Sequence, residues 1–348
     1  MNSSRGNSLL ITVAALVVTI AGMQAATSLL VPFLLAAFIA IICLPPLNWL
    51  TRHKIPAGIG VLIITLLLLL VGSLIGVFVG ASVADFSHNL PGYQARLNDQ
   101  MAALLTWLAS LGLDINAQLL RENLDPSAAM GMAGNLLSGL GNALANTFLI
   151  VLTVIFLLIE ATALPNKWMA MGPAAPATAG FGKFLDSVNS YMAIKGWVSL
   201  ATGLIIAIWL TILDVDYPLL WGLLAFLFNF VPNIGSIIAA IPAVLLALVQ
   251  FGPGAAMAAG AGYVAVNIIM GNVIEPRFMG KGVGLSTLVV FISLVFWGWV
   301  LGPVGMLLSV PLTMIVKLAL EARQDTRWIA VLLGPDIEPK IDKDQGLM

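Results

Sequence analysis

The feature that most constrains this sequence is the length of its stretches without a charged side chain. No Asp, Glu, Lys or Arg occurs in residues 6–51, 55–84, 126–159, 196–213, 217–274 or 282–316. A helix needs about 20 apolar residues to cross about 30 Å of hydrocarbon, so these stretches have room for about two, one, one, one, three and two passes. Such runs are too long for the alternating strands of a membrane barrel. The sequence therefore predicts an all-α, polytopic integral membrane protein.

Composition excludes several other classes of protein. The 348 residues are 60% hydrophobic and only 9% charged, whereas soluble domains are about 25% charged, so a soluble enzyme and a disordered chain are excluded. The net charge of -1 argues against a nucleic-acid partner. Cys43 is the one cysteine, and His53 and His88 are the two histidines. We therefore expect no disulfide framework, no metal site and no cofactor.

The basic residues predict the orientation of the chain. If the N-terminus is cytoplasmic and the spans alternate, 13 of the 15 Lys and Arg side chains lie inside and only Arg96 and Arg121 lie outside. The inside set is Arg5, Arg52, Lys54, Lys167, Lys183, Lys195, Arg277, Lys281, Lys317, Arg323, Arg327, Lys340 and Lys343. This bias follows the positive-inside rule of bacterial cell membranes. We expect a multi-pass protein of the inner membrane with both termini in the cytoplasm.

The charge pattern also divides the chain. Residues 1–83 are expected to form three N-terminal spans, 84–145 a helical extracytoplasmic insertion, 146–320 a C-terminal membrane domain with broken helices, and 321–348 a cytoplasmic tail. The apolar run from Leu9 also resembles a signal peptide, but a second run follows at once from Leu29 and favours a retained first span. The insertion fits either a small helical cap packed on the membrane surface, or an oligomer contact or vestibule.

Three glycines recur every fourth residue in the third span, at Gly72, Gly76 and Gly80. This spacing lets two helix backbones approach closely. The pattern fits helix packing within one chain, and it also fits a contact between subunits.

The charge-free stretch 217–274 contains a predicted helix break. The break holds Asn229, Pro232, Asn233, Gly235 and Ser236. Pro232 lacks an N–H and Gly235 permits unusual dihedrals, so backbone groups are left unpaired there. Such groups are tolerated at membrane depth only where they are buried in protein or line a wet cavity. We interpret the segment as a broken helix or re-entrant hairpin that forms part of a substrate site; the alternative is a plain loop at the inner surface.

A second polar segment follows, with Asn267, Asn272, Glu275 and Arg277. A carboxylate and a guanidinium this close to hydrocarbon must be paired or hydrated. Glu275 and Arg277 are candidates for a gate or for coupling to protons, or they belong to a positively charged anchor loop. The nearby GKGVGLST, residues 280–287, lacks the glycine and the Ser/Thr that a phosphate-binding loop requires.

The same residues carry a family resemblance. DVDYPLLWGLLAFLFNFVPNIGSIIAAIP and GNVIEPRFMGKGVGLSTLVVFISLVFWGWVLGPVGMLLSVPLT, with VPFLLAAFIAIICLPPL and LDPSAAM upstream, resemble the AI-2E family of membrane proteins. The resemblance covers nearly the whole chain. It implies eight spans, an inner-membrane location, a homo-oligomer with a pentamer as its expected form, and export of the quorum-sensing signal autoinducer-2. The family pattern includes PNIG at Pro232–Gly235 and EPR at Glu275–Arg277.

Three functions remain after this reasoning. The first is secondary or facilitated export of a small polar signal along a path lined by Asn229, Asn233, Ser236, Asn267 and Asn272. The second is sodium (cation)/proton antiport, which some family members are assigned. The third is a membrane scaffold that transports nothing. The spans show no paired carboxylates, no Cys/His pair and no serine with a recognisable base, so an enzyme is not expected. The expected partners are the signal molecule, the lipid bilayer and further copies of the chain.

Overall fold

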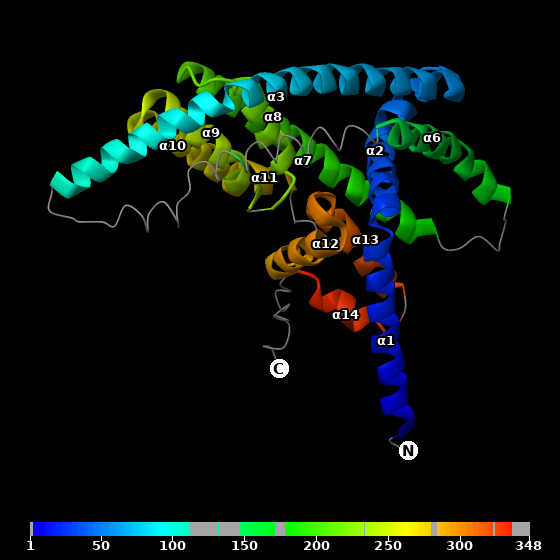
Figure 1. Ribbon diagram of the computed structural model, residues 1–348. Coiled ribbons are helices and arrows are strands. Elements are labelled where there is room, and N and C mark those ends of the chain that lie inside the picture. The colour runs from blue at the N-terminus through cyan, green and yellow to red at the C-terminus, as the bar shows by residue number, and fades with distance from the viewer. Residues whose placement is uncertain are drawn as a thin grey trace, which may run out of the picture.

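The computed structural model describes residues 3–110, 131, 147–170, 178–232, 234–279, 284–322 and 324–335. All of its regular elements are helices, and Figure 1 shows their arrangement. They are α1 (Ser3–Ala25), α2 (Thr27–Arg52), α3 (Ala57–Ser110), α6 (Thr147–Ala170), α7 (Thr178–Ile212), α8 (Pro218–Phe228), α9 (Gly235–Phe251), α10 (Pro253–Asn267), the π-helix η2 (Ile268–Ile274), α11 (Glu275–Met279), α12 (Thr287–Leu307), α13 (Ser309–Glu321) and α14 (Arg327–Leu332).

Six helical segments of the described chain are long and apolar enough to cross a membrane. They are Thr27–Arg52, Ala57–Gln100, Thr147–Leu164, Ser187–Ile212, Pro253–Phe278 and Thr287–Leu307. Shorter apolar helices accompany them, among them α8 and α9. Their outer faces keep large apolar side chains uncovered, such as Val77 at 74% and Trp197 at 72% exposure, as lipid contact requires. The predicted all-α, polytopic membrane fold is confirmed.

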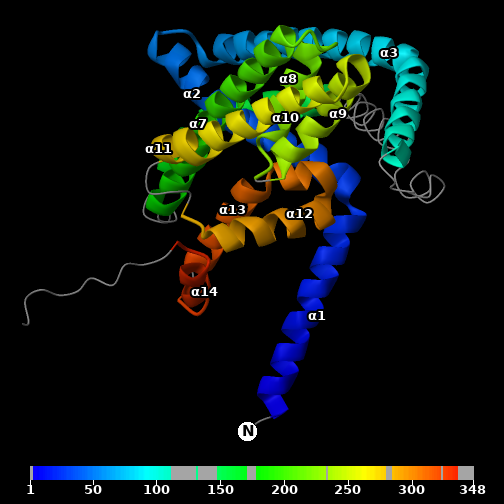
Figure 2. The same ribbon diagram turned by 90° about the vertical axis from the view of Figure 1, so that its left-hand side faces the viewer.

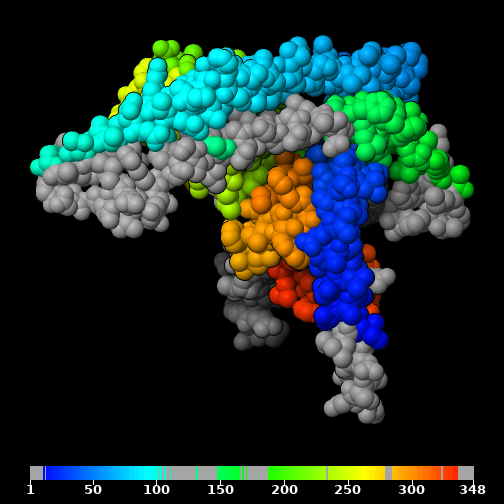
Figure 3. Space-filling model, viewed as in Figure 1, coloured from blue at the N-terminus to red at the C-terminus, as the bar shows by residue number. Residues whose placement is uncertain are grey.

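Helix α3 is the longest element, with 54 residues, which is about 80 Å at 1.5 Å per residue. It continues without interruption across residues 83–84, so the third span and the start of the insertion are one helix. Pro91 lies inside it, and Figure 2 shows a sharp bend in its second half, as a missing N–H permits. In the space-filling view α3 forms a ridge along one edge of the molecule (Figure 3). Residues 111–130 and 132–146 of the insertion lie outside the described residues, and the division into domains stays a prediction.

Helices α7, α8, α9 and α10 pack together and hold the polar segments. Gly203 of α7 and Gly222 of α8 allow this, because a Cβ on either would lie 2.6 Å from the carbonyl oxygen of the other. The indole of Trp209 lies over Gly262 of α10, and its Nε1 donates a hydrogen bond to the Ala258 carbonyl at 3.1 Å. Small residues at these two crossings bring α8 and α10 close to α7. The break between α8 and α9 therefore lies beside the polar residues of α7 and α10.

The C-terminal helices form a second packed unit. Gly302 adopts φ 69°, a left-handed conformation that interrupts α12 before Pro303. The chain then returns as α13, and the Trp297 indole donates to the Thr313 hydroxyl at 3.0 Å. Gln24, in α1, donates to the Trp299 carbonyl at 3.2 Å, so the first helix is tied to this hairpin.

Candidate functional site

The helix break between α8 and α9 is the centre of the site. Helix α8 ends at Phe228 and α9 begins at Gly235. In the turn between them the Val231 N–H donates to the Phe228 carbonyl at 2.8 Å, and Pro232 has no N–H to give. A Cβ on Gly235 would lie 1.8 Å from the Phe228 oxygen. Only glycine therefore lets the start of α9 lie against the end of α8.

Two pairs of neutral polar side chains flank this break. The Asn229 amide donates to the hydroxyl of Ser199 in α7 at 2.9 Å, and both residues are buried. The Ser236 hydroxyl donates to Asn267 Oδ1 in α10 at 2.8 Å. Each pair joins one side of the break to a neighbouring helix by a hydrogen bond between uncharged groups. The structure thus brings together three of the predicted path residues: Asn229, Ser236 and Asn267.

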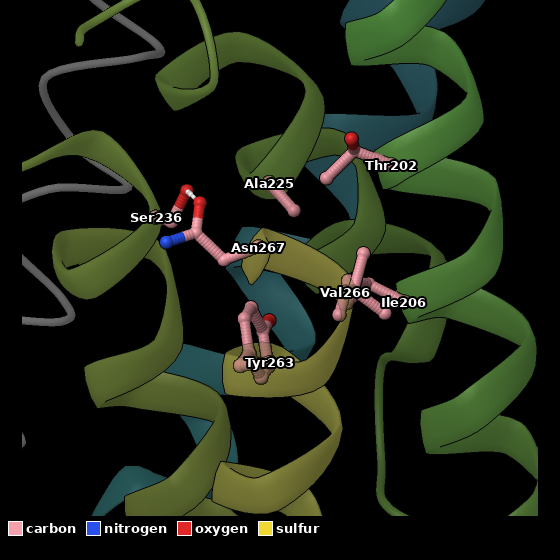
Figure 4. Close-up of a pocket in the computed structure, with 7 residues that line it drawn as sticks. All are labelled: Thr202, Ile206, Ala225, Ser236, Tyr263, Val266 and Asn267. Carbon is pink, nitrogen blue, oxygen red and sulfur yellow. Dashed lines mark hydrogen bonds between the residues drawn. The ribbon is translucent and has the colours of Figure 1, made fainter. Parts of the chain in front are cut away.

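A small cavity lies between these helices (Figure 4). Its lining residues are Thr202, Ile206, Ala225, Ser236, Tyr263, Val266 and Asn267. The space open to the centre of a water molecule is about 10 Å³, which is room for about one water. In the described state this space is therefore too small for a solute larger than water.

Not every predicted path residue lines this cavity, and Asn229 is not part of its wall. Asn272 is exposed on the surface of the described chain, and Asn233 lies outside the described residues. Sequence reasoning missed three hydroxyl residues that face the site, Ser199, Thr202 and Tyr263. Their only sequence signal was a hydroxyl in a span free of charges, and many lipid-spanning helices carry such residues.

Beyond the cavity, α10 passes into a π-helix. Seven residues, Ile268–Ile274, take this wider turn between Asn267 and Glu275. The Glu275 N–H donates to the Met270 carbonyl, five residues back. π-helical segments are uncommon and often mark functional sites. The π-helix η2 lies between Asn267, which lines the cavity, and Glu275, the next charged residue.

That charged group is an interior ion pair. Lys195 Nζ lies 2.8 Å from both carboxylate oxygens of Glu275, with side chains only 6% and 18% exposed. Lys195 comes from α7, so the pair fastens α7 to the α10–α11 segment. Arg277, the basic residue nearest in sequence, is exposed and forms no ion pair with another described residue. Sequence reasoning identified Glu275 but not Lys195, because 80 residues separate them.

The predicted glycine stripe has no partner in the described part of the chain. A Cβ on Gly72 or on Gly80 would meet nothing within 4 Å. The helices of the described chain therefore leave these two positions uncovered. Whether Gly72, Gly76 and Gly80 contact another subunit stays a prediction.

A second polar network joins α3 to the turn between α7 and α8. The Tyr217 hydroxyl donates to Asp85 at 2.7 Å and accepts from Asn89 at 3.0 Å. The Tyr93 hydroxyl donates to Asp216 at 2.9 Å. Burial, and then the hydrogen bond to Asp85, raise the pKa of the Tyr217 hydroxyl above its ordinary value. This network holds the long helix against the core of the protein.

Groups that bind metal ions are not gathered in the described residues, where no three His, Cys, Asp or Glu side chains cluster. The polar groups at the helix break are amides and hydroxyls. Such groups suit hydrogen bonding to an uncharged solute.

Comparison with known proteins agrees with this architecture. A family model described as "AI-2E family transporter" matches residues 10–325. The chain is 42% identical over 330 residues to the AI-2 transport protein TqsA of Escherichia coli (strain K12), covering 94% of this chain and 96% of that protein. It is 39% identical over 336 residues to a "Putative transport protein" of Haemophilus influenzae, with 94% and 96% covered. It is 38% identical over 333 residues to "Putative transport protein YhhT" of Escherichia coli (strain K12), with 95% of each chain covered. The family match includes the helix break, the cavity and the ion pair, and the chain belongs to the AI-2E family of transporters.

Proposed function

We propose that this protein exports a small, uncharged, polar signal across the bacterial inner membrane, with autoinducer-2 as the substrate. The relative TqsA, named as an AI-2 transport protein, supports the choice of substrate. The observation that carries the proposal is the helix break with its two neutral pairs, Asn229–Ser199 and Ser236–Asn267. Both pairs lie beside a break in the helix, where a path for a polar solute would need groups that form hydrogen bonds.

The pairs suit a polyhydroxylated solute for a physical reason. A solute that leaves water loses its hydrogen bonds, and an unreplaced bond between buried polar groups costs about 1–3 kcal/mol. The hydrogen bond within each pair can be exchanged for hydrogen bonds to the solute. This exchange is possible because amide and hydroxyl groups both donate and accept hydrogen bonds. The small closed cavity implies that α8 and α9 must move away from α7 and α10 before a solute enters.

The orientation and assembly are also part of the proposal. We place the N- and C-termini in the cytoplasm, because this arrangement puts 13 of the 15 basic residues inside. We propose a homo-oligomer, since the described residues of one chain leave Gly72 and Gly80 uncovered. The protein acts as a transporter and not as an intramembrane enzyme.

The test is flux of labelled autoinducer-2 from proteoliposomes that contain the purified protein. Empty liposomes set the background, and a proton gradient is imposed in half of the samples to identify a coupled mechanism. We expect Asn229→Leu to lower the flux about tenfold, because it leaves Ser199 without its partner. Asn48→Leu, at an exposed position of α2, is the matched control and keeps the wild-type flux. Equal flux in liposomes with and without protein would refute export.

A second candidate, sodium (cation)/proton antiport, is favoured by one observation. Glu275 is a carboxylate held in the interior by Lys195, and antiport needs a carboxylate that exchanges protons. Sodium-dependent pH changes inside the same vesicles, abolished by Glu275→Gln, would support it. Autoinducer-2 flux without a sodium-dependent pH change would support export alone. A scaffold would show no autoinducer-2 flux and no sodium-dependent pH change.

A further inference from the structure

One polar atom near the helix break has no partner. The hydroxyl of Tyr263, in α10, forms no hydrogen bond with any described residue, although the side chain is only 5% exposed. The other tyrosines at polar sites differ, since Tyr93 and Tyr217 both donate to carboxylates. A buried hydroxyl without a partner destabilises the fold, so such groups are rare and call for an explanation.

The location of Tyr263 suggests that explanation. Tyr263 is part of the wall of the small cavity, between the Ser236–Asn267 pair of α9 and α10 and the α7 residues Thr202 and Ile206 (Figure 4). The opening movement required for transport would enlarge this space, and the Tyr263 hydroxyl would then be in contact with its contents.

The rest of the wall indicates what those contents are. Its described residues are all uncharged. Hydroxyl and amide groups come from Thr202, Ser236 and Asn267, and apolar surface comes from Ile206, Ala225 and Val266. This mixture fits a compact ring with several hydroxyls, which offers both polar edges and apolar faces. It does not fit a phosphate, because burying an anion without a cationic partner is strongly unfavourable.

The nearest interior cation does not change this conclusion. Lys195 is already paired with Glu275, with both carboxylate oxygens 2.8 Å from its Nζ. Binding an anion through Lys195 would require breaking that pair and leaving the Glu275 carboxylate uncompensated.

We infer that the Tyr263 hydroxyl is a specificity-determining contact for an uncharged polyhydroxylated solute, and that the phosphate ester of such a solute is rejected. This inference rests on the proposed export function. It adds to that function a contact residue and the rejection of the phosphate ester.

The test is the concentration dependence of autoinducer-2 flux in proteoliposomes for the wild-type protein and Tyr263→Phe. We expect KM to rise about 2- to 10-fold with little change in kcat, as loss of one hydrogen bond to the bound solute predicts. The thermal stability of Tyr263→Phe should equal or exceed that of the wild type, because the substitution removes an unpaired buried hydroxyl. The control Tyr93→Phe should lower stability and leave KM unchanged, since neither Tyr93 nor its partner Asp216 is among the residues that line the cavity.

Competition tests the substrate class in the same vesicles. Unlabelled autoinducer-2 should compete with the labelled compound, and its phosphate ester should not. Competition by the ester as strong as that by the neutral compound would overturn the claim for an uncharged substrate.

Failure of this inference differs from failure of the export function. If the wild type transports and Tyr263→Phe has an unchanged KM, the contact is refuted and export stands. If Tyr263→Phe loses stability while KM is unchanged, the hydroxyl serves the fold through a bound water, which also refutes the contact. Absence of flux in the wild type refutes export itself.

Discussion

The ion pair between Lys195 and Glu275 gives the sharpest quantitative prediction. At 2.8 Å, two unit charges attract by about 6 kcal/mol at an effective dielectric constant of about 20. Most of this attraction offsets the cost of taking both charges out of water. Glu275→Gln removes the attraction and leaves the ammonium in place with side chains packed around it. The expected loss of unfolding free energy is therefore about 3–5 kcal/mol.

The assay is equilibrium unfolding in mixed detergent micelles, with helix content as the signal. The double variant Lys195→Met/Glu275→Gln removes both charges, and we expect it to regain most of the stability lost in Glu275→Gln. The matched control is the ion pair of Lys167 and Glu160, whose side chains are 55% and 57% exposed. Because water screens exposed pairs, Lys167→Met should change stability by less than about 1 kcal/mol.

Two results would refute this reasoning. The first is a loss in Glu275→Gln no larger than that in Lys167→Met, which would mean that water reaches the Lys195 ammonium. The second is a double variant as unstable as Glu275→Gln, which would mean that the side chains serve packing and that their charges are unimportant. The single variant Lys195→Met completes a double-mutant cycle, and a coupling free energy near zero between Lys195 and Glu275 in it would support the same conclusion.

Three further predictions follow from close contacts and polar partners. Gly235→Ala should cost about 1–3 kcal/mol or more, because its Cβ meets the Phe228 carbonyl, and circular dichroism of thermal unfolding measures the loss. Gly72→Leu should leave the unfolding of the detergent-solubilised monomer unchanged, since the space around Gly72 is open; a changed oligomer distribution in cross-linking, with the monomer intact, supports a subunit contact. The raised pKa of Tyr217 means that stability is complete below about pH 10 and falls as pH rises further, as the unfolded chain loses the proton first. Tyr217→Phe should flatten that fall above about pH 10, and an equal slope in both proteins would contradict the raised pKa of Tyr217.

Much of the site was predictable because it depends on local chemistry. Pro232 and Gly235 together favour a helix break in an apolar stretch, since one lacks an N–H and the other tolerates contacts that a Cβ forbids. Asn229, Ser236 and Asn267 were conspicuous as polar groups in charge-free spans. Asn272 had the same composition signal, but it faces outward. The helical phase after Asn267 is altered by the π-helix, and nothing in the sequence announces that change of period.

The sequence by itself determined that this chain spans a membrane as helices, because lipid leaves the backbone no other partner and the charge-free runs have the required length. It also determined where the helices break. Only the tertiary structure decided which polar groups meet. The contact of Asn229 with Ser199, that of Lys195 with Glu275 and the place of Tyr263 in the cavity wall depend on how closely α7, α8 and α10 pack. That packing depends on glycine and tryptophan contacts between distant segments, which no local pattern encodes.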